Sequence, residues 1–81
     1  MSDAIVIPSQ IRAARAYLGW SIPQLSVASG VSVRTIKYYE HSEHIVKVET
    51  LSKLSGALQA AGIEFIGTPD DNPGIRWRGR P

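Results

Sequence analysis

The chain has 81 residues and a formal net charge of +2, from nine Lys and Arg against seven Asp and Glu. A chain of this length builds one compact domain and has little room for a deep substrate cavity, so a two-domain enzyme is excluded. Hydrophobic residues make up 43% and charged residues 20% of the sequence, which is the balance of a folded globular domain. The small positive charge does not by itself indicate a nucleic-acid partner.

The sequence contains no cysteine and no long apolar segment. Disulfides, thiolate catalysis and cysteine-bound zinc are therefore excluded, and a reducing compartment fits the composition. The N-terminus has no basic stretch and only a short apolar run, Ala4 to Ile7, so neither a signal peptide nor a membrane helix is expected. We expect a small cytoplasmic protein without a membrane partner.

The pattern along the chain divides it into three parts. Residues 1–8 have no helical period and are expected to form an N-terminal arm or a short strand around Ile5-Val6-Ile7. Residues 9–61 carry the helical period, and residues 62–81 combine a strand, a turn and a basic tail. The sequence therefore predicts an all-α, compact bundle of four to five helices with a short C-terminal β-strand or hairpin.

The first helix is expected over residues 9–18. Its apolar side chains repeat every three to four positions, so Arg12 and Arg15 are expected to point away from the core. The neighbouring aromatic residues, Tyr17 and Trp20, are interpreted as core or helix-packing residues rather than as a stacking platform for bases.

The second helix is expected after Ser21, a typical N-cap, with Leu25 and Ala28 on its buried face. The stretch that follows is the most informative in the chain. Gly30 can adopt the positive φ that ends a helix, and Ser32 can cap the next helix two residues later. Helices joined by so short a turn must cross steeply, which is the arrangement of a helix-turn-helix.

Two further helices complete the predicted bundle. The third continues to about residue 40 or 41, with Ile36 and Tyr39 turned inward, and a loop over residues 41–47 follows it. The fourth occupies about residues 48–61 and carries a stripe of leucines. Gly56 within it costs about 1 kcal/mol relative to alanine, and no feature of the sequence explains it.

Several short motifs occur in a fixed order through the helical region. They are Gln10-Ile11-Arg12-Ala13-Ala14-Arg15, Leu18-Gly19-Trp20-Ser21, Gly30-Val31-Ser32, Thr35-Ile36, Glu40, and Thr50-Leu51 to Ala57-Leu58. Together they resemble the Cro and phage-repressor (xenobiotic-response-element) type of helix-turn-helix over residues 10–66. The resemblance implies a lambda-repressor-like fold and sequence-specific binding of double-stranded DNA by a transcriptional regulator, such as a repressor or an antitoxin. The family usually has Ala where Ser26 stands, and Ser is small enough for the same helix crossing.

A second resemblance covers only residues 30–40, which are similar to the first helices of mercury-resistance-type regulators. Those proteins begin directly with the helix-turn-helix and continue into a winged hairpin. Here a helix precedes the motif and a leucine-striped helix follows it, so the repressor type is preferred.

In the repressor architecture, the N-terminal half of the third helix lies in the major groove. Its outward positions would contact bases: Arg34 can hold O6 and N7 of guanine, which is worth roughly 1–3 kcal/mol of discrimination. Lys37 can contact guanine or a phosphate, Val33 a thymine methyl, and Tyr38 a base edge or the backbone. Phosphate contacts are expected from a second set: Ser21, Ser32, Thr35, His41, His44 and Lys47.

No other chemistry is indicated. His41 and His44, with Glu40 and Glu43 beside them, lack the distant third ligand and the spacing of a metal site. No nucleophile is placed beside a base, and there is no glycine-rich phosphate loop. We therefore expect no enzyme activity, no catalytic residues, no metal and no cofactor.

The C-terminal segment, residues 62–81, allows two arrangements. Two strands around the turn of residues 68–74 can fold back as a hairpin that covers the helical core, or can pair with the same strands of a second copy. We expect a homodimer that reads a near-palindromic operator with its third helices about 34 Å apart. The residues expected at the dimer contact are Ile63, Phe65, Ile75 and Trp77.

Two alternatives stay open. Arg76, Arg78 and Arg80 can instead contact DNA beside the operator. The whole fold can also serve as a protein-interaction module, in which the apolar tail docks a protein partner such as a toxin and no specific DNA binding occurs.

Overall fold

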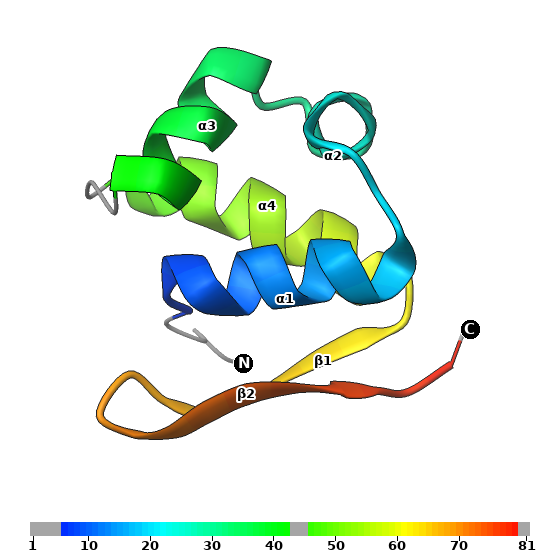
Figure 1. The fold of residues 1–81 in the computed structure, drawn as a ribbon, viewed down its shortest axis with the longest axis vertical. Coiled ribbons are helices and arrows are strands. Elements are labelled where there is room, and N and C mark those ends of the chain that lie inside the picture. Colours follow the sequence, from blue (N-terminus) through cyan, green and yellow to red (C-terminus); the bar gives the residue numbers. More distant parts are fainter. Residues whose placement is uncertain (1–5, 43–45, 80–81) are drawn as a thin grey trace.

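The computed structural model describes residues 6–42 and 46–79. Within these ranges the chain forms four helices followed by a hairpin (Figure 1). The elements are α1 (Pro8–Leu18), α2 (Ile22–Ser29), α3 (Val33–Ser42), α4 (Val48–Ala60), β1 (Ile63–Thr68) and β2 (Asp71–Trp77). The prediction of a mostly helical, compact domain with a C-terminal hairpin is confirmed. The expectations for Ile5, Glu43, His44 and Arg80 lie outside the described residues.

The helices form one body, and the hairpin lies along its side (Figure 1). Helix α1 runs between the hairpin and α3, so the two are on opposite sides of the molecule. The core lies where the helices meet, and seven of its side chains have no exposed surface. These are Ile11, Ala14, Leu25, Ile36, Leu54, Leu58 and Ile63. Burial of each large aliphatic side chain is worth about 1.5–3 kcal/mol relative to exposure.

Local sequence signals set the ends of the first two helices. Ser21 Oγ accepts a hydrogen bond from Gln24 N at 3.2 Å, and Gln24 Oε1 accepts one from Ser21 N at 2.7 Å, which is a complete capping box at the start of α2. Gly19 and Gly30 follow α1 and α2 with φ of 71° and 75°, the left-handed conformation that ends a helix. These predicted starts and stops are confirmed.

Three details of the N-terminal arm and the first two helices differ from the prediction. Ala28 is exposed rather than buried: Leu25 is the one buried residue of the short helix α2, and Val31, in the turn that follows, is buried as well. Helix α1 begins at Pro8, whose fixed φ suits the first helical position. Val6 precedes the helix without forming a strand, and at 4% exposure it belongs to the core rather than to an arm.

The hairpin pairs its two strands antiparallel within one chain. Ile63 lies opposite Trp77, and Phe65 lies opposite Ile75, so these four side chains share one face of the ladder. Ile63 is fully buried, and Phe65 and Ile75 pack against the helical core. Of the two arrangements open to the sequence, this structure has the hairpin that folds onto its own helices.

The hairpin turn is shorter than predicted. Only Pro69 and Asp70 separate the strands, so residues 71–74, which were expected in the turn, belong to β2. The register of the ladder shifts between Ile66 and Thr68. Gly67 and Asn72 take left-handed φ values of 77° and 53° beside this shift, and Gly and Asn are the residues that tolerate that conformation.

Helix α1 holds the hairpin at two points. Gln10, which is 4% exposed, donates from Nε2 to the carbonyl oxygens of Ile66 at 3.1 Å and Gly74 at 2.9 Å. Two helical turns further on, the Tyr17 and Trp77 rings lie 5.4 Å apart and are tilted by 37°. Tyr17 is thus not a core residue: it is 58% exposed and packs on the hairpin.

Candidate nucleic-acid interface

Helix α3 has a buried face and an outward face. Ile36 is fully buried and Tyr39 is 4% exposed, so both point into the protein as predicted. The outward face lines an open hollow of about 570 Å³. Its lining residues are Val33, Arg34, Lys37 and Tyr38. The structure therefore brings the four predicted base-contacting residues together on one surface.

The four side chains of this surface differ in character. Arg34 and Lys37 are exposed cations one turn apart, and no acidic residue occupies the first turn of α3. Tyr38 is 51% exposed, and Val33 is half-buried at the start of the helix. The outward face of α3 thus combines two hydrogen-bonding cations with apolar surface.

Hydrogen bonds from α2 fix the turn that precedes α3. Ser26 Oγ donates to the Val31 carbonyl oxygen at 2.6 Å, and Ser29 Oγ accepts from Val31 N at 3.2 Å. Both backbone polar groups of this buried residue are therefore satisfied by side chains of α2, which fixes the angle between the two helices. The sequence predicts only that Ser26 is small enough for the helix crossing, and this hydrogen bond is an addition to that role.

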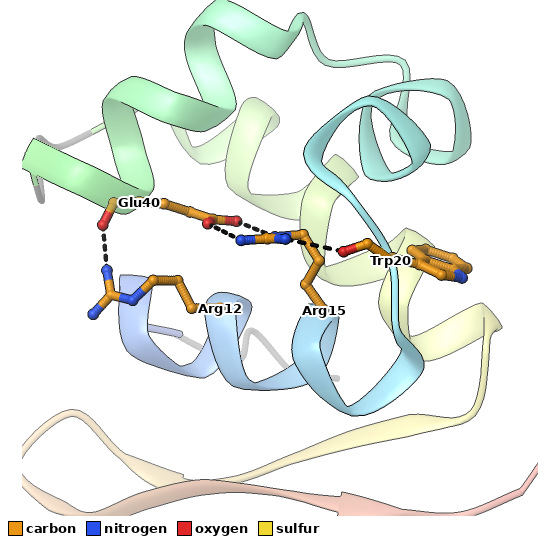
Figure 2. A network of polar contacts seen from close by, with 4 residues as sticks. All are labelled: Arg12, Arg15, Trp20 and Glu40. Atoms are coloured by element: carbon orange, nitrogen blue, oxygen red, sulfur yellow. Dashed lines mark hydrogen bonds and ion pairs between the residues drawn. The ribbon is translucent and has the colours of Figure 1, made fainter.

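The far end of α3 is anchored to α1 by two arginines (Figure 2). Arg15 donates from Nε and Nη2 to the two carboxylate oxygens of Glu40, at 3.0 and 2.8 Å, and from Nη1 to the Trp20 carbonyl at 2.9 Å. The Glu40 side chain has no exposed surface. Arg12 donates to the Glu40 carbonyl oxygen. The anchor thus joins α1, the α1–α2 connection and the last turns of α3.

This anchor corrects a prediction, because Arg12 and Arg15 were expected to point away from the core. A buried carboxylate is costly without a charged partner, so Glu40 draws the Arg15 guanidinium inward. The carbonyl groups at a helix C-terminus carry partial negative charge, which favours the Arg12 guanidinium there. A lone acidic residue on an otherwise inward face of α3 was the signal available in the sequence.

The helix-turn-helix family profile matches residues 11–65, which run from α1 into β1 and cover most of the chain. This range includes the turn, the outward face of α3 and the anchor at Glu40. The chain belongs to the Cro and phage-repressor type of helix-turn-helix proteins. A search of the curated proteins found no match.

In this helix-turn-helix protein, the residues predicted to contact phosphate lie near helix ends where the structure describes them, and His44 lies outside the described residues. Ser21 caps α2, and Ser32 Oγ accepts a hydrogen bond from Thr35 N at 3.1 Å at the start of α3. The Ser32 and Thr35 hydroxyl groups also bond each other at 2.9 Å. His41 is exposed in the last turn of α3, and Lys47 is exposed directly before α4.

In this helix-turn-helix protein, the residues predicted to form the dimer contact lie away from α3. They lie on the hairpin, on the other side of α1 (Figure 1). Trp77 is the most accessible of them at 42% exposure, whereas Ile63 has no exposed surface. Arg76 also lies on the hairpin and forms an exposed ion pair with Glu64 at 3.0 Å.

Residues 6–42 and 46–79 contain neither a metal-binding cluster nor a membrane-spanning helix. No three His, Cys, Asp or Glu side chains there come together in a way that could hold a metal ion. None of the helices in these ranges is both long and apolar enough to span a membrane.

Proposed function

We propose that this protein is a sequence-specific, double-stranded DNA-binding transcriptional regulator that reads the major groove with α3. The observation that carries this proposal is the outward face of α3, where Val33, Arg34, Lys37 and Tyr38 surround one open hollow on the second helix of a helix-turn-helix. Membership of a family of DNA-binding regulators supports it.

The side chains of α3 suit distinct roles on DNA. Arg34 presents a planar fork of N–H groups that matches O6 and N7 of guanine. Lys37 supplies a flexible cation for guanine or for the backbone. The exposed Lys47 and the amides at the starts of α2 and α3 would hold phosphates and set the register of the protein on the duplex.

We also propose that the protein acts as a homodimer on a near-palindromic operator, with half-sites about 34 Å apart. The two-stranded hairpin supports this, because each strand has an outer edge and Trp77 and Tyr17 expose aromatic surface beside it. Since Ile63, Phe65 and Ile75 already pack on their own helices, the partner would contact Trp77, Tyr17 and a strand edge.

The biological role follows from this proposal. Such a protein would act in the cytoplasm as a repressor or an antitoxin, and would need neither catalysis nor a cofactor. An antitoxin would also bind a toxin, and the aromatic pair of Tyr17 on α1 and Trp77 on β2 offers a surface for it that does not include α3.

The test is selection of binding sequences from a random double-stranded DNA pool at about physiological salt, followed by titration of the winners against salt. We expect a near-palindrome whose affinity falls steeply as salt rises. Enrichment of a single half-site would support DNA binding and contradict the proposed homodimer. No enrichment would refute the regulator and leave the protein-interaction module, whose partner would then be sought on the hairpin.

A further inference from the structure

The outer edge of β2 presents backbone hydrogen-bonding groups that β1 does not use. Arg78 N donates to the Gly62 carbonyl oxygen at 2.7 Å, so these two residues are a hydrogen-bonded pair at the end of the ladder. Hydrogen-bonded and non-hydrogen-bonded pairs alternate along an antiparallel ladder. The N–H and C=O groups of Ile75 and Trp77 therefore point away from β1. Such an edge can accept a further strand.

The charges of this strand are separated along its length. Asp71 is its first residue, preceded by Asp70, and Arg78 directly follows its last residue. Arg76, near the same end, already pairs with Glu64. A parallel copy of β2 would place like charges beside each other, whereas an antiparallel copy places the acidic start of each strand beside the basic end of the other. The charges of β2 are therefore complementary to those of a second, antiparallel β2.

We infer that β2 pairs antiparallel with β2 of a second copy, with the two-fold axis at Ile75, so that the two hairpins form one four-stranded sheet. This inference rests on the proposed homodimer and specifies its contact. An axis at this position makes the two copies of Ile75 a hydrogen-bonded pair, because their N–H and C=O groups face each other. It also places the exposed ring of Trp77 beside Pro73 of the second copy.

The two neighbouring registers fit less well. An axis at Arg76 would put the two Arg76 side chains directly opposite each other, and like charges in that position are destabilising. An axis at Gly74 would make Pro73 the partner of Ile75 on both sides of the axis, and proline has no N–H to donate. Pro73 is compatible with the hairpin itself, because its nitrogen points toward the outer edge, where a strand tolerates proline.

The same pairing directs both α3 helices to one side. Adjacent antiparallel strands are related by an axis perpendicular to the sheet, so the helices of both copies lie on the same face of the joined sheet. Helix α1 lies between the hairpin and α3 (Figure 1), and each α3 therefore faces away from that sheet. Each copy measures 27 × 27 × 21 Å. Copies placed side by side thus separate their α3 helices by roughly one body width, which is comparable with the half-site spacing of about 34 Å.

Introduced cysteines test the register, because the chain has no cysteine of its own. In the inferred register, position 74 of one copy and position 76 of the other form a non-hydrogen-bonded pair with Cα atoms about 4.5 Å apart, which a disulfide can bridge. Gly74→Cys and Arg76→Cys are made separately in the full chain. Both positions accept the change: a Cβ at Gly74 lies 3.7 Å from Ile66 Cγ1, an ordinary contact, and Arg76 is exposed.

The two cysteine variants are oxidised alone and as a mixture, and the products are separated on a non-reducing gel. We expect a disulfide-linked dimer in the mixture and none in either variant alone. Identical positions of the two copies are diagonal neighbours about 7–8 Å apart in this register, which is beyond the reach of a disulfide.

A second pair of variants tests the backbone N–H of Ile75 without cysteine. Ile75→Pro and Ile75→Ala both remove the isoleucine side chain, but only proline removes the N–H, which β1 does not use. Two hydrogen bonds across the axis are lost in the proline variant. In sedimentation equilibrium, its dimer should therefore dissociate at least about tenfold more readily than that of the alanine variant. Circular dichroism establishes that both variants are folded.

The outcomes separate this contact from the function on which it rests. A disulfide in Gly74→Cys alone or in Arg76→Cys alone would indicate another register and overturn the inference. A mixture without the disulfide, in a protein that still selects a near-palindrome, would overturn the inference and leave the DNA-binding homodimer intact. A disulfide in the mixture of a protein that selects no DNA sequence would support the inference and refute the regulator.

Discussion

Arg15 and Glu40 join the first helix to the end of α3 through two parallel hydrogen bonds, of 3.0 and 2.8 Å, on a carboxylate with no exposed surface (Figure 2). The pair fixes the last turns of the helix that carries the candidate DNA surface, while hydrogen bonds from α2 fix the turn at its start. Its importance lies in position, because a buried ion pair need not stabilise a fold more than an apolar pair of the same size.

Breaking this pair from one side should be strongly destabilising. Arg15→Met leaves the Glu40 carboxylate buried and unpaired, and we expect the free energy of unfolding to fall by about 3–5 kcal/mol. Glu40→Gln should cost less, because the Arg15 side chain is 21% exposed and can turn to water. Urea unfolding followed by far-UV circular dichroism measures both. Equal losses in the two variants would contradict the view that the buried carboxylate dominates.

The double variant, Arg15→Met with Glu40→Met, serves as the control for that experiment. It removes both charges and leaves apolar side chains in their place, so stability should recover toward that of the parent chain. If DNA affinity still falls in the stable double variant, the pair is needed to position α3 and not only to keep the protein folded.

The exposed cations of the candidate interface should separate into base-reading and backbone-binding residues. Arg34→Ala should weaken binding to the selected operator by about 1–3 kcal/mol and relax the preference at one base pair, with the melting temperature unchanged. Lys47→Ala should weaken binding to all sequences equally and reduce the slope of log Kd against log salt by about one. Anisotropy titrations on matched and mismatched duplexes distinguish the two patterns, and uniform weakening by Arg34→Ala would exclude base reading.

The Tyr39 hydroxyl should make the fold sensitive to high pH. Burial raises the pKa of Tyr39 to about 12 from 10.0, while the nearby Arg12 opposes the shift, and the hydroxyl donates to the Val6 carbonyl at 3.3 Å. Because the folded pKa is the higher one, this contribution to stability is complete below pH 10 and is lost as the pH rises to about 12. Urea midpoints measured at pH 9, 10, 11 and 12 should therefore fall more steeply in the parent chain than in Tyr39→Phe. Parallel curves would show that Tyr39 does not carry this dependence.

The helical half of the fold follows from local signals in the sequence. Gly19, Ser21 and Gly30 each specify a helix end through their own backbone or side-chain chemistry, and the structure has those ends where the sequence predicts them. The outward residues of α3 were also predictable, because the helical period that buries Ile36 and Tyr39 leaves the other positions outside.

Contacts between distant segments were not predictable in the same way. In the sequence, Arg12 and Arg15 have the positions of ordinary exposed cations. Only the folded chain brings Glu40 beside them. Gln10 is a similar case, because its partners lie on a hairpin more than fifty positions away. Periodicity assigns a residue to a face of its own helix, but it does not identify the element packed against that face.

Gln10 should control the attachment of the hairpin. Its amide donates to two carbonyl oxygens of the ladder and its Oε1 accepts from Ile7 N at 3.0 Å. Gln10→Glu replaces the donor with a carboxylate that faces those two carbonyls, and we expect a loss of at least about 2 kcal/mol at pH 7. Gln10→Leu removes the same hydrogen bonds without adding a charge.

The two Gln10 variants should differ in their dependence on pH. The carboxyl group of Gln10→Glu should have a folded pKa above its unfolded value of about 4.3, because the buried carboxylate lacks a donor. The stability cost of the buried carboxylate is therefore present at pH 7 and disappears as the pH falls below the unfolded pKa of about 4.3. The loss of stability in Gln10→Leu does not depend on pH. Hydrogen exchange of the β1 and β2 amides, at pH 7 and below the pKa of about 4.3, measures how firmly the hairpin is attached. Faster exchange confined to α3 would contradict the role of Gln10 in this attachment.

Two glycines should respond to alanine in opposite directions. At Gly56, in α4, an added Cβ would meet no described atom within 4 Å beyond its chain neighbours and the nearby backbone of its own helix, so the helix propensity of alanine should stabilise the protein by about 1 kcal/mol. At Gly62 the backbone has φ of +112°, and a Cβ would lie 2.7 Å from Trp77 Cζ3 and 2.8 Å from the Gly79 carbonyl oxygen. Gly62→Ala should therefore cost at least about 2 kcal/mol and move the Trp77 ring. In thermal unfolding, Gly56→Ala should raise the midpoint by roughly 4–8 °C. Gly62→Ala should lower it and change tryptophan fluorescence, and an unchanged spectrum would show that Trp77 does not rest on this glycine.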